Sequence, residues 1–278
     1  MSGWLTVRCG SSPLLLSVPH AGIDIPPEID GRLTSTWLAR KDTDWWVDRL
    51  YELAAPIDAT IVRTSVSRTV IDVNRDPSGV SLYPGQATTE LCPTTTFDGE
   101  PLYRDGLAPD AVEIQRRKTL WFEPYHQALS SELARLRTIH DRVVLYDCHS
   151  IRSIIPRLFD GILPDFNLGT NGGANCAPEL TAAVEEACDA TSLSRVTNGR
   201  FTGGWITRQY GRPQAGVHAI QLELACRVYL AEPIGRVDET SWPVAFDNAY
   251  AAPMADALSK VLQLCVEFAI GTTRGATP

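Results

Sequence analysis

The length, composition and charge of the chain limit the kinds of protein that it can be. Its 278 residues suffice for one large α/β domain or two small ones, and a content of 44% hydrophobic and 21% charged residues is that of a soluble globular protein. The formal net charge of −8 argues against a nucleic-acid partner, which would favour a basic face.

The cysteines and the first residues point to a cytoplasmic protein. The seven cysteines are odd in number, widely spaced and without a CxxC pair, which is typical of reduced thiols rather than of a disulfide framework. The segment MSGWLTVRCGSS lacks the basic-then-apolar order of a signal peptide, and every apolar run is shorter than the roughly 20 residues that a membrane span needs. No membrane partner is therefore expected.

The first part of the chain alternates predicted strands and helices. The apolar run at 13–20 predicts a core strand, and residues 43–56 carry apolar side chains at helical spacing, with Pro56 closing the helix. The β-branched residues at 59–67 predict a second strand. Residues 77–108 are rich in Pro, Gly and Thr without periodicity, and a loop of that length is commonly a lid or a binding loop.

The second part continues the alternation and sets the predicted fold class. Its expected elements are a helix at 110–140 with a break at Pro124, a strand at 142–150, a helix at 177–191, a glycine-interrupted strand or hairpin at 196–211, a strand at 217–225, and a helix at 241–270 broken near Pro253. This order predicts an α/β three-layer sandwich around a mostly parallel or mixed sheet. Without repeats or a linker, we expect a single domain over 1–278 with a disordered tail at about 271–278.

Two of the five histidines stand at the carboxyl ends of predicted core strands. His20 ends the run at 13–20, and His149 lies in VLYDCHSI, where an apolar strand passes into polar side chains. Ligand sites in open α/β sheets lie beyond such strand ends, so both imidazoles would face one crevice and could bind a metal. The third ligand should be a carboxylate, and Asp42 and Asp44 open the next predicted helix. Helix capping and an ordinary buried histidine are the alternative roles.

Glu223 is an acidic residue within the apolar predicted strand HAIQLELA. Burying a carboxylate is costly unless it is paired or functional, and a buried Glu223 would be the general base for a water at the metal. However, the alternation of Ile220 and Leu222 with Gln221 and Glu223 equally fits a strand with one solvent-exposed face. The sequence leaves both interpretations open.

Arginines could form a cationic pocket within this acidic chain. Asn74 and Arg75 follow a predicted strand in DVNRD, and arginine is suited to bidentate capture of a carboxylate. Arg208 stands beside glycines in GGWITRQYG, and Arg68 lies at the end of the predicted strand at 59–67. A surface position in a turn is the alternative for Arg75 taken alone. Together these residues would suit a small anionic substrate.

An ordered set of segments resembles the N-formylglutamate amidohydrolase (N-formylglutamate deformylase) family of histidine degradation. The segments are SVPHAG, DTDWWVDRLY, SRTVIDVNRDPSG, LYDCHSI, GGWITRQYG and QLEL, and the resemblance extends over most of the chain. It implies a zinc-dependent amidohydrolase with a phosphorylase/hydrolase-like α/β fold, similar to zinc carboxypeptidases and aspartoacylases. The implied reaction is hydrolysis of N-formyl-L-glutamate to formate and L-glutamate.

The resemblance also implies roles for particular residues. His20 and His149 match the metal-binding histidines of the family, and Glu223 resembles the base of the wider superfamily. The pair Asn74 and Arg75 resembles the Asn-Arg pair that holds a substrate carboxylate in those relatives. The second carboxylate of the substrate is then expected at Arg208, with Arg68 as a further donor.

The chain departs from its carboxypeptidase-like relatives at one metal ligand. Those relatives place an acidic ligand three residues after the first histidine, where this chain has Ile23. We therefore expect the carboxylate ligand from DTDW, with Asp44 preferred to Asp42. Zn²⁺ is the expected ion, and Fe²⁺, Mn²⁺ or Co²⁺ could also occupy a site of two histidines and a carboxylate.

Two alternative functions are compatible with the same residues. One is hydrolysis of another N-acyl amino acid on the same scaffold. The other is a non-catalytic protein that binds small dicarboxylates through its arginines. The sequence leaves the oligomeric state open, including a homo-oligomer.

Overall fold

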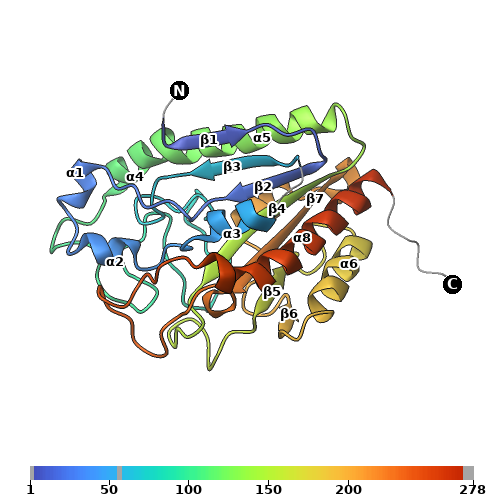
Figure 1. Ribbon diagram of the computed structural model, residues 1–278. Helices are drawn as coiled ribbons and strands as arrows, with labels where there is room; N and C mark the ends of the chain where they lie inside the picture. Colours follow the sequence, from blue (N-terminus) through green and yellow to red (C-terminus); the bar gives the residue numbers. More distant parts are fainter. Residues whose placement is uncertain (1–2, 55–57, 272–278) are drawn as a thin grey trace.

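The computed structural model describes residues 3–54 and 58–271 and is built around a seven-stranded mixed sheet (Figure 1). The expectations for Pro56 and for the tail at 272–278 lie outside the described residues. The strands are β1 (Leu5–Arg8), β2 (Leu14–Val18), β3 (Thr60–Thr64), β4 (Val143–Ile151), β5 (Phe166–Gly169), β6 (Arg195–Thr197) and β7 (Val217–Ala225).

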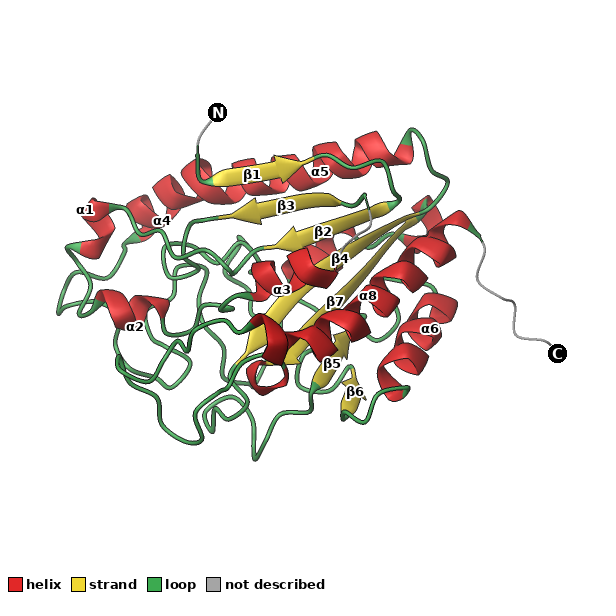
Figure 2. Ribbon diagram, viewed as in Figure 1, coloured by secondary structure: helices red, strands yellow, loops and turns green. Residues whose placement is uncertain are grey.

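The sheet order is β1-β3-β2-β4-β7-β5-β6, and its centre is parallel. Strands β3, β2, β4 and β7 run in one direction, whereas β1 is antiparallel to β3 and β5 is antiparallel to β7. The carboxyl ends of the four central strands point towards the side of the molecule where loops gather (Figure 2). The predicted mixed α/β sheet is confirmed.

Helices cover both faces of the sheet and make the fold a three-layer sandwich. One face packs against α3 (Val47–Ala54), α6 (Pro178–Asp189) and α8 (Asn248–Ile270). The other packs against α4 (Ala111–Arg117), a π-helical turn (Lys118–Phe122), α5 (Glu123–Arg137) and α7 (Trp205–Tyr210). The remaining elements are α1 (Pro27–Asp30), α2 (Thr36–Arg40) and the 3₁₀ turns Pro213–Ala215 and Cys226–Val228. Among the described helices, none is long and apolar enough to cross a membrane.

The alternation of side chains along β4 separates the core from the polar strand end. Tyr146 and Cys148 point into the layer that contains α8, and Cys148 is fully buried there as a core thiol. Leu145 points to the layer that contains α5, and Asp147 and His149 continue on that same face towards the carboxyl end. One face of the strand is therefore apolar as far as Cys148, whereas the other carries polar side chains at Asp147 and His149.

One predicted element is wrong, because residues 196–211 do not form a hairpin. Only the end of β6 is a strand there, and helix α7 begins after Gly204. The backbone N–H of Ile206, in the first turn of α7, donates to the Asn74 side-chain oxygen at 2.7 Å. A Cβ on Gly204 would lie 2.5 Å from the Asn74 amide, so this glycine permits the close approach. A distant side chain, rather than local periodicity, starts the helix.

The helices predicted at 110–140 and 241–270 form with altered boundaries. The break expected at Pro124 takes the form of a π-helical turn directly before α5, within a helix that runs on continuously from α4. Helix α8 begins only after Asp247, whose carboxylate accepts from the N–H of Ala249 and Tyr250. It continues through Pro253 at the cost of one backbone hydrogen bond.

His126 on α5 is predicted to make stability depend on pH. Its Nε2 donates to the carbonyl of Val73 at 2.8 Å, its Nδ1 lies 2.9 Å from the Tyr210 hydroxyl, and burial lowers its pKa to about 4. In the unfolded chain the pKa is about 6.5, so between these values the unfolded state binds a proton that the folded state does not. The free energy of unfolding should therefore fall as the pH falls from about 6.5 to 4, by up to about 3 kcal/mol from this group.

Urea unfolding of the wild type and of His126→Gln across this pH range measures the effect. The variant should show a shallower loss of stability on acidification. Part of the slope should remain, because burial also lowers the pKa of His218 to about 4. An unchanged slope in His126→Gln would contradict the assignment.

Candidate active site

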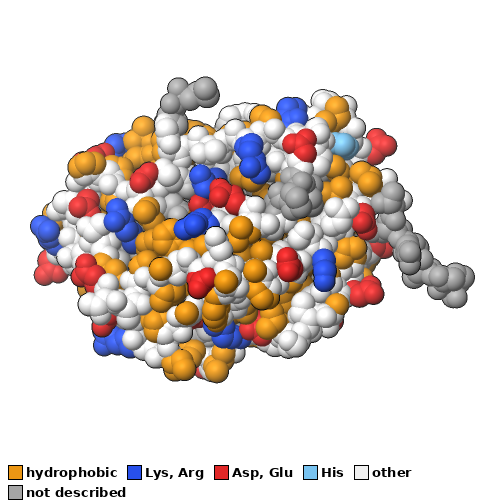
Figure 3. Space-filling model, viewed as in Figure 1, with side chains coloured by type: hydrophobic (Ala, Val, Ile, Leu, Met, Phe, Trp, Pro, Cys, Tyr) orange, Lys and Arg blue, Asp and Glu red, His pale blue; other side chains and the backbone are white. Residues whose placement is uncertain are grey.

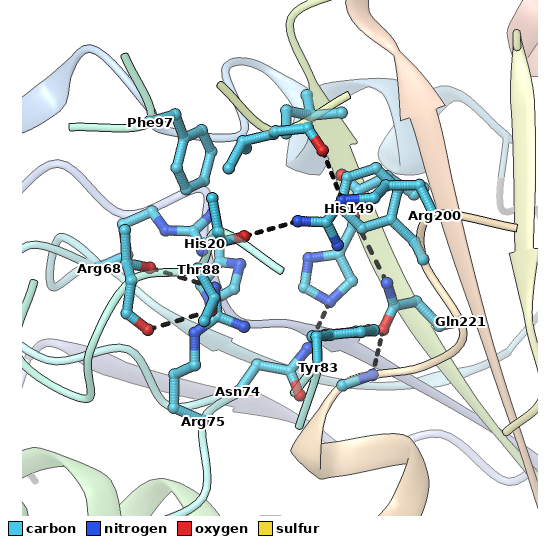
Figure 4. A pocket seen from close by; sticks show the side chains of 17 residues that line it. His20, Arg68, Asn74, Arg75, Tyr83, Thr88, Phe97, His149, Arg200 and Gln221 are labelled. Atoms are coloured by element: carbon cyan, nitrogen blue, oxygen red, sulfur yellow. Dashed lines mark hydrogen bonds between the residues drawn. The ribbon is translucent and has the colours of Figure 1, made fainter. Parts of the chain in front are cut away.

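The carboxyl ends of β2, β4 and β7 open into a cavity of about 550 Å³, including its mouth. Its walls come from the loops after these strands, from the 77–108 loop and from the segment between β6 and α7 (Figure 4). The residues that line it are His20, Arg68, Asn74, Arg75, Tyr83, Ala87, Thr88, Thr89, Phe97, His149, Ile151, Leu158, Arg200, Phe201, Gly204, Gln221 and Glu223.

His20, Asp44 and His149 converge at one edge of the cavity. All three are buried, and they present ligand atoms that lie within 4.8 Å of one another. Asp44 Oδ2 is 3.0 Å from His149 Nδ1 and 3.7 Å from His20 Nδ1. The two imidazole rings are 4.8 Å apart between centroids. This geometry matches the predicted donor set.

The backbone around Asp44 is shaped to deliver its carboxylate. The Asp44 N–H donates to the carbonyl of His20 at 3.1 Å, and Oδ2 accepts from the N–H of Ser150 at 3.2 Å. Trp46, just before α3, has a φ of 61°, a left-handed conformation that is strained for a bulky residue. Its indole N–H is held by the Val244 carbonyl at 2.9 Å. The turn at residues 41–46, between α2 and α3, therefore directs Asp44 between the two histidines.

Two further carboxylates, Asp72 and Asp147, hold the outer nitrogens of the histidines. Asp72 Oδ1 is 2.7 Å from His20 Nε2, and Asp147 Oδ2 is 2.9 Å from His149 Nε2. If each Nε2 carries the proton, both Nδ1 atoms are lone-pair donors facing Asp44. His20 Nδ1 is buried and has no hydrogen-bond partner among residues 3–54 and 58–271. A carboxylate behind each histidine and an unpartnered nitrogen in front are what a metal centre requires, so these residues fit a divalent ion.

The surroundings shift the pKa values of the two histidines in opposite directions. Burial and the Arg68 guanidinium lower the pKa of His20 against the pull of Asp72 and Asp44, so His20 is the neutral form that ligates metals. Burial opposes protonation of His149, but Asp147 and Asp44 raise its pKa well above the usual value. The carboxylates thus favour positive charge at His149, which a cation would equally supply.

Asp42, the alternative ligand, instead holds a loop. Its Oδ2 accepts from the N–H of Phe97 at 2.6 Å, and its Oδ1 accepts from Arg152 Nη2 at 3.0 Å. Asp98 takes a second bond from the same Arg152 nitrogen at 2.7 Å. Asp42 therefore ties the 77–108 loop to the end of β4 and places the Phe97 ring against the cavity.

Glu223 lies on β7 directly beside His149 in the sheet register and is only 7% exposed. The polar face that alternation predicted exists, but it faces the cavity and not solvent. Burial raises the pKa of Glu223 to about 7, with Asp44 adding to the rise and His149 opposing it. Gln221 steadies this carboxylate, since its Nε2 is 3.4 Å from Glu223 Oε2 while its Oε1 accepts from the Gly204 N–H at 2.7 Å. A carboxyl group with such a pKa is suited to proton transfer near neutral pH.

Asn74, Arg75 and Arg68 all line the cavity, but their contacts differ. The Asn74 oxygen is taken by α7, and its Nδ2 donates to Asp147 Oδ2 at 3.0 Å and lies 2.9 Å from His149 Nε2. Arg68 donates to Asp44 at 3.3 Å and to Asp72 at 2.8 Å, so its charge is compensated. Arg75 donates to Thr89 Oγ1 at 3.1 Å, while its Nε is 3.5 Å from Asp72 and makes no hydrogen bond. Arg75 is the more available of the two arginines.

Arg208 lies behind the cavity wall rather than in it. Over the described residues the lining does not include Arg208, whose guanidinium donates to the Gly203 carbonyl at 2.9 Å and to Thr202 Oγ1 at 3.0 Å. Arg200, which our sequence analysis did not single out, lines the cavity from the same segment. The role of Arg208 as a substrate ligand stays a prediction.

Sequence reasoning assigned no role to four residues of the site, although three of them stood in motifs that it used. Asp72 begins DVNRD and Asp147 precedes the cysteine of DCHS, and a carboxylate near each ligand histidine was the available signal. Gln221 shares the face of Glu223. Arg200 had no signal, because its segment was predicted to be a strand or hairpin. The irregular 77–108 loop contributes Tyr83, Thr88, Thr89 and Phe97 to the wall, among other residues.

Together, the three-layer α/β fold and the buried His-Asp-His cluster beside a carboxylate base define an α/β protein with a candidate hydrolytic centre. The family model for N-formylglutamate amidohydrolase matches residues 12–230, and the chain belongs to that family.

Individual relatives agree with this assignment. The chain is 45% identical over 264 residues to the N-formylglutamate deformylase of Pseudomonas aeruginosa, covering 95% of this chain and 94% of the relative. It is 44% identical to that of Pseudomonas putida over 260 residues, covering 93% and 94%. The crystal structure of an N-formylglutamate amidohydrolase from Ralstonia eutropha JMP134 shares the fold, with a TM-score of 0.77 and 21% identity over 97% of this chain and 99% of that one.

Proposed function

We propose that the chain hydrolyses N-formyl-L-glutamate to formate and L-glutamate, using a divalent metal held by His20, Asp44 and His149. The observation that carries the proposal is that this cluster, Glu223 and three arginines lie at one cavity. The relatives named N-formylglutamate deformylase support the substrate.

A metal in this cluster would act as a Lewis acid on the formyl oxygen and on the attacking water. Asp72 and Asp147 would fix the histidine rings so that both Nδ1 atoms stay turned inward. Zn²⁺ is our proposal for the ion, since two imidazoles and one carboxylate are a common ligand set for catalytic zinc.

Glu223 would move the proton during the reaction. Its carboxylate takes a proton from the attacking water as the water oxygen bonds to the formyl carbon. The same proton then passes to the leaving amine nitrogen as the carbon–nitrogen bond breaks, which releases formate and L-glutamate. A pKa of about 7 suits both halves of this transfer, because the group gives and takes a proton with similar ease near neutral pH.

Arg75 would orient the substrate by binding its α-carboxylate. Its guanidinium is near Asp72, which contacts His20 of the candidate metal cluster. Its Nε has no hydrogen-bond acceptor among the described residues. Asn74 borders the same place, and it would have to release one of its present contacts to donate to the substrate. Positive and negative side chains are interspersed over the face drawn in Figure 3, which shows no large basic patch. We therefore propose that the substrate anion is bound by the arginines of the cavity. We also propose a cytoplasmic role in histidine degradation, as the family resemblance implies.

Formate release on metal-quantified protein tests the function. Turnover of N-formyl-L-glutamate should exceed that of N-acetyl-L-glutamate, should stop when a chelator removes the metal and should return when Zn²⁺ is added. If only N-acetyl-L-glutamate is hydrolysed, the assignment of N-formyl-L-glutamate as the substrate is wrong. If the metal-free protein is fully active, the proposed metal dependence is wrong.

A further inference from the structure

Arg200 differs from the other arginines of the cavity in having no acidic partner. Its Nη2 donates to the Ala87 carbonyl at 2.7 Å and its Nε to the Leu158 carbonyl at 2.7 Å. Among the described residues, no carboxylate oxygen lies within 4.0 Å of its guanidinium nitrogens. Neutral carbonyls hold the guanidinium in place but leave its charge uncompensated.

The surroundings of Arg200 make this uncompensated charge significant. Its guanidinium lies 5.4 Å from the Tyr83 ring centroid and 5.2 Å from that of Phe201. Burial is the main cause that lowers the pKa of Arg200, and repulsion from Arg75 lowers it further, whereas Tyr83 and Glu223 oppose the shift. An anion between Arg75 and Arg200 would relieve that repulsion. A dicarboxylate would give each arginine an anionic group.

The walls near Arg200 also fit one end of the substrate better than the other. Arg68, Arg75 and Arg200 are seen around the cavity in Figure 4, with Arg68 and Arg75 near His20 and Arg200 near His149 and Gln221. Arg200 is flanked by Leu158 and Phe201, and Ile151 lines the same cavity. Apolar side chains of this kind pack against methylene groups, which lie only on the side-chain arm of glutamate.

We infer that Arg200 binds the side-chain carboxylate of the substrate and thereby selects a glutamate-type substrate over an uncharged one. The inference rests on the proposed function and names the residue that reads the second carboxylate. It assigns that position to Arg200 instead of Arg208, whose guanidinium lies behind the wall. It also gives the 77–108 loop a role, since the Ala87 carbonyl orients Arg200 and the Tyr83 hydroxyl donates to the Gly203 carbonyl at 3.1 Å.

The test compares N-formyl-L-glutamate with N-formyl-L-glutamine, which has the same shape without the side-chain charge. We expect Arg200→Met to lower kcat/KM for the glutamate substrate by about 100-fold and for the glutamine substrate by less than about 3-fold, with Arg200→Lys in between. Arg212→Met is the matched control, because Arg212 also donates to two backbone carbonyls but is exposed and outside the cavity. It should leave both substrates unchanged.

Equal losses for both substrates in Arg200→Met and Arg200→Lys would mean a purely structural role and would overturn the inference. If both Arg200 variants still prefer N-formyl-L-glutamate to N-formyl-L-glutamine and Arg208→Met loses this preference, the inference is wrong, and Arg208 binds the side-chain carboxylate. If the wild type releases no formate, the proposed function fails by itself, and calorimetric titration with L-glutamate and L-glutamine decides about Arg200. Tighter binding of L-glutamate that Arg200→Met abolishes would support the inference, and equal binding of both by the wild type would overturn it.

Discussion

Glu223→Gln is expected to lower kcat for N-formyl-L-glutamate by about 10²- to 10⁴-fold while the protein stays folded and keeps its metal. The substitution keeps the size of the side chain and an oxygen that can accept from Gln221, and it removes the negative charge and the ability to accept a proton. Because glutamine cannot take a proton from water, the loss should appear in kcat, and KM should change little. Steady-state formate release together with metal analysis of the same samples measures both quantities.

Glu232→Gln provides the matched control for this substitution. Glu232 is a partly buried glutamate that accepts from the backbone N–H of Ser153 at 2.7 Å, and it does not border the cavity. We expect its replacement to leave kcat close to that of the wild type. A Glu223→Gln enzyme that retains a kcat within about 3-fold of the wild type would exclude Glu223 as the base.

Asp44→Asn is expected to weaken metal binding by at least about 100-fold and to reduce activity in parallel, since substitutions even in the second shell of metal sites cost about 10- to 100-fold. The change removes the charge that lies between the two histidines but keeps the side-chain shape. His20→Gln should have a similar effect, because it removes the unpartnered Nδ1. Competition with a chromophoric chelator measures the affinity independently of turnover.

Asp42→Asn separates this effect from damage to the surrounding loop. Asparagine keeps an oxygen that can accept from the Phe97 N–H, so the loop should remain attached. We expect this variant to bind metal with wild-type affinity. Loss of metal from Asp42→Asn, with retention in Asp44→Asn, would reverse the assignment of the carboxylate ligand.

Local sequence patterns suffice for the elements that build the sheet. The apolar runs at 13–20, 142–150 and 217–225 correspond to β2, β4 and β7, because a strand covered by helices on both faces is rich in apolar residues. Local patterns fail at 196–211, where the start of α7 depends on Asn74, more than a hundred residues away in the sequence. The short strands β1 and β5 were also missed, since four residues carry too little periodicity.

The sequence by itself determined which reactive side chains the site contains and the family of the chain. Histidines at two strand ends, an acidic residue in an apolar strand and a set of arginines in an acidic chain indicated a metal-assisted reaction on a small anion, and the ordered motifs identified the family.

Only the tertiary structure decided where each of several similar side chains lies relative to the cavity. Asp42 and Asp44 are two positions apart in one motif, yet the turn before α3 sends one to a loop and the other between the histidines. Glu223 has a raised pKa only because loops cover the alternating face of β7. Arg200 and Arg208 lie in one segment, and only the fold of that segment places one in the cavity. Each choice depends on contacts between residues far apart in the chain, which local periodicity does not encode.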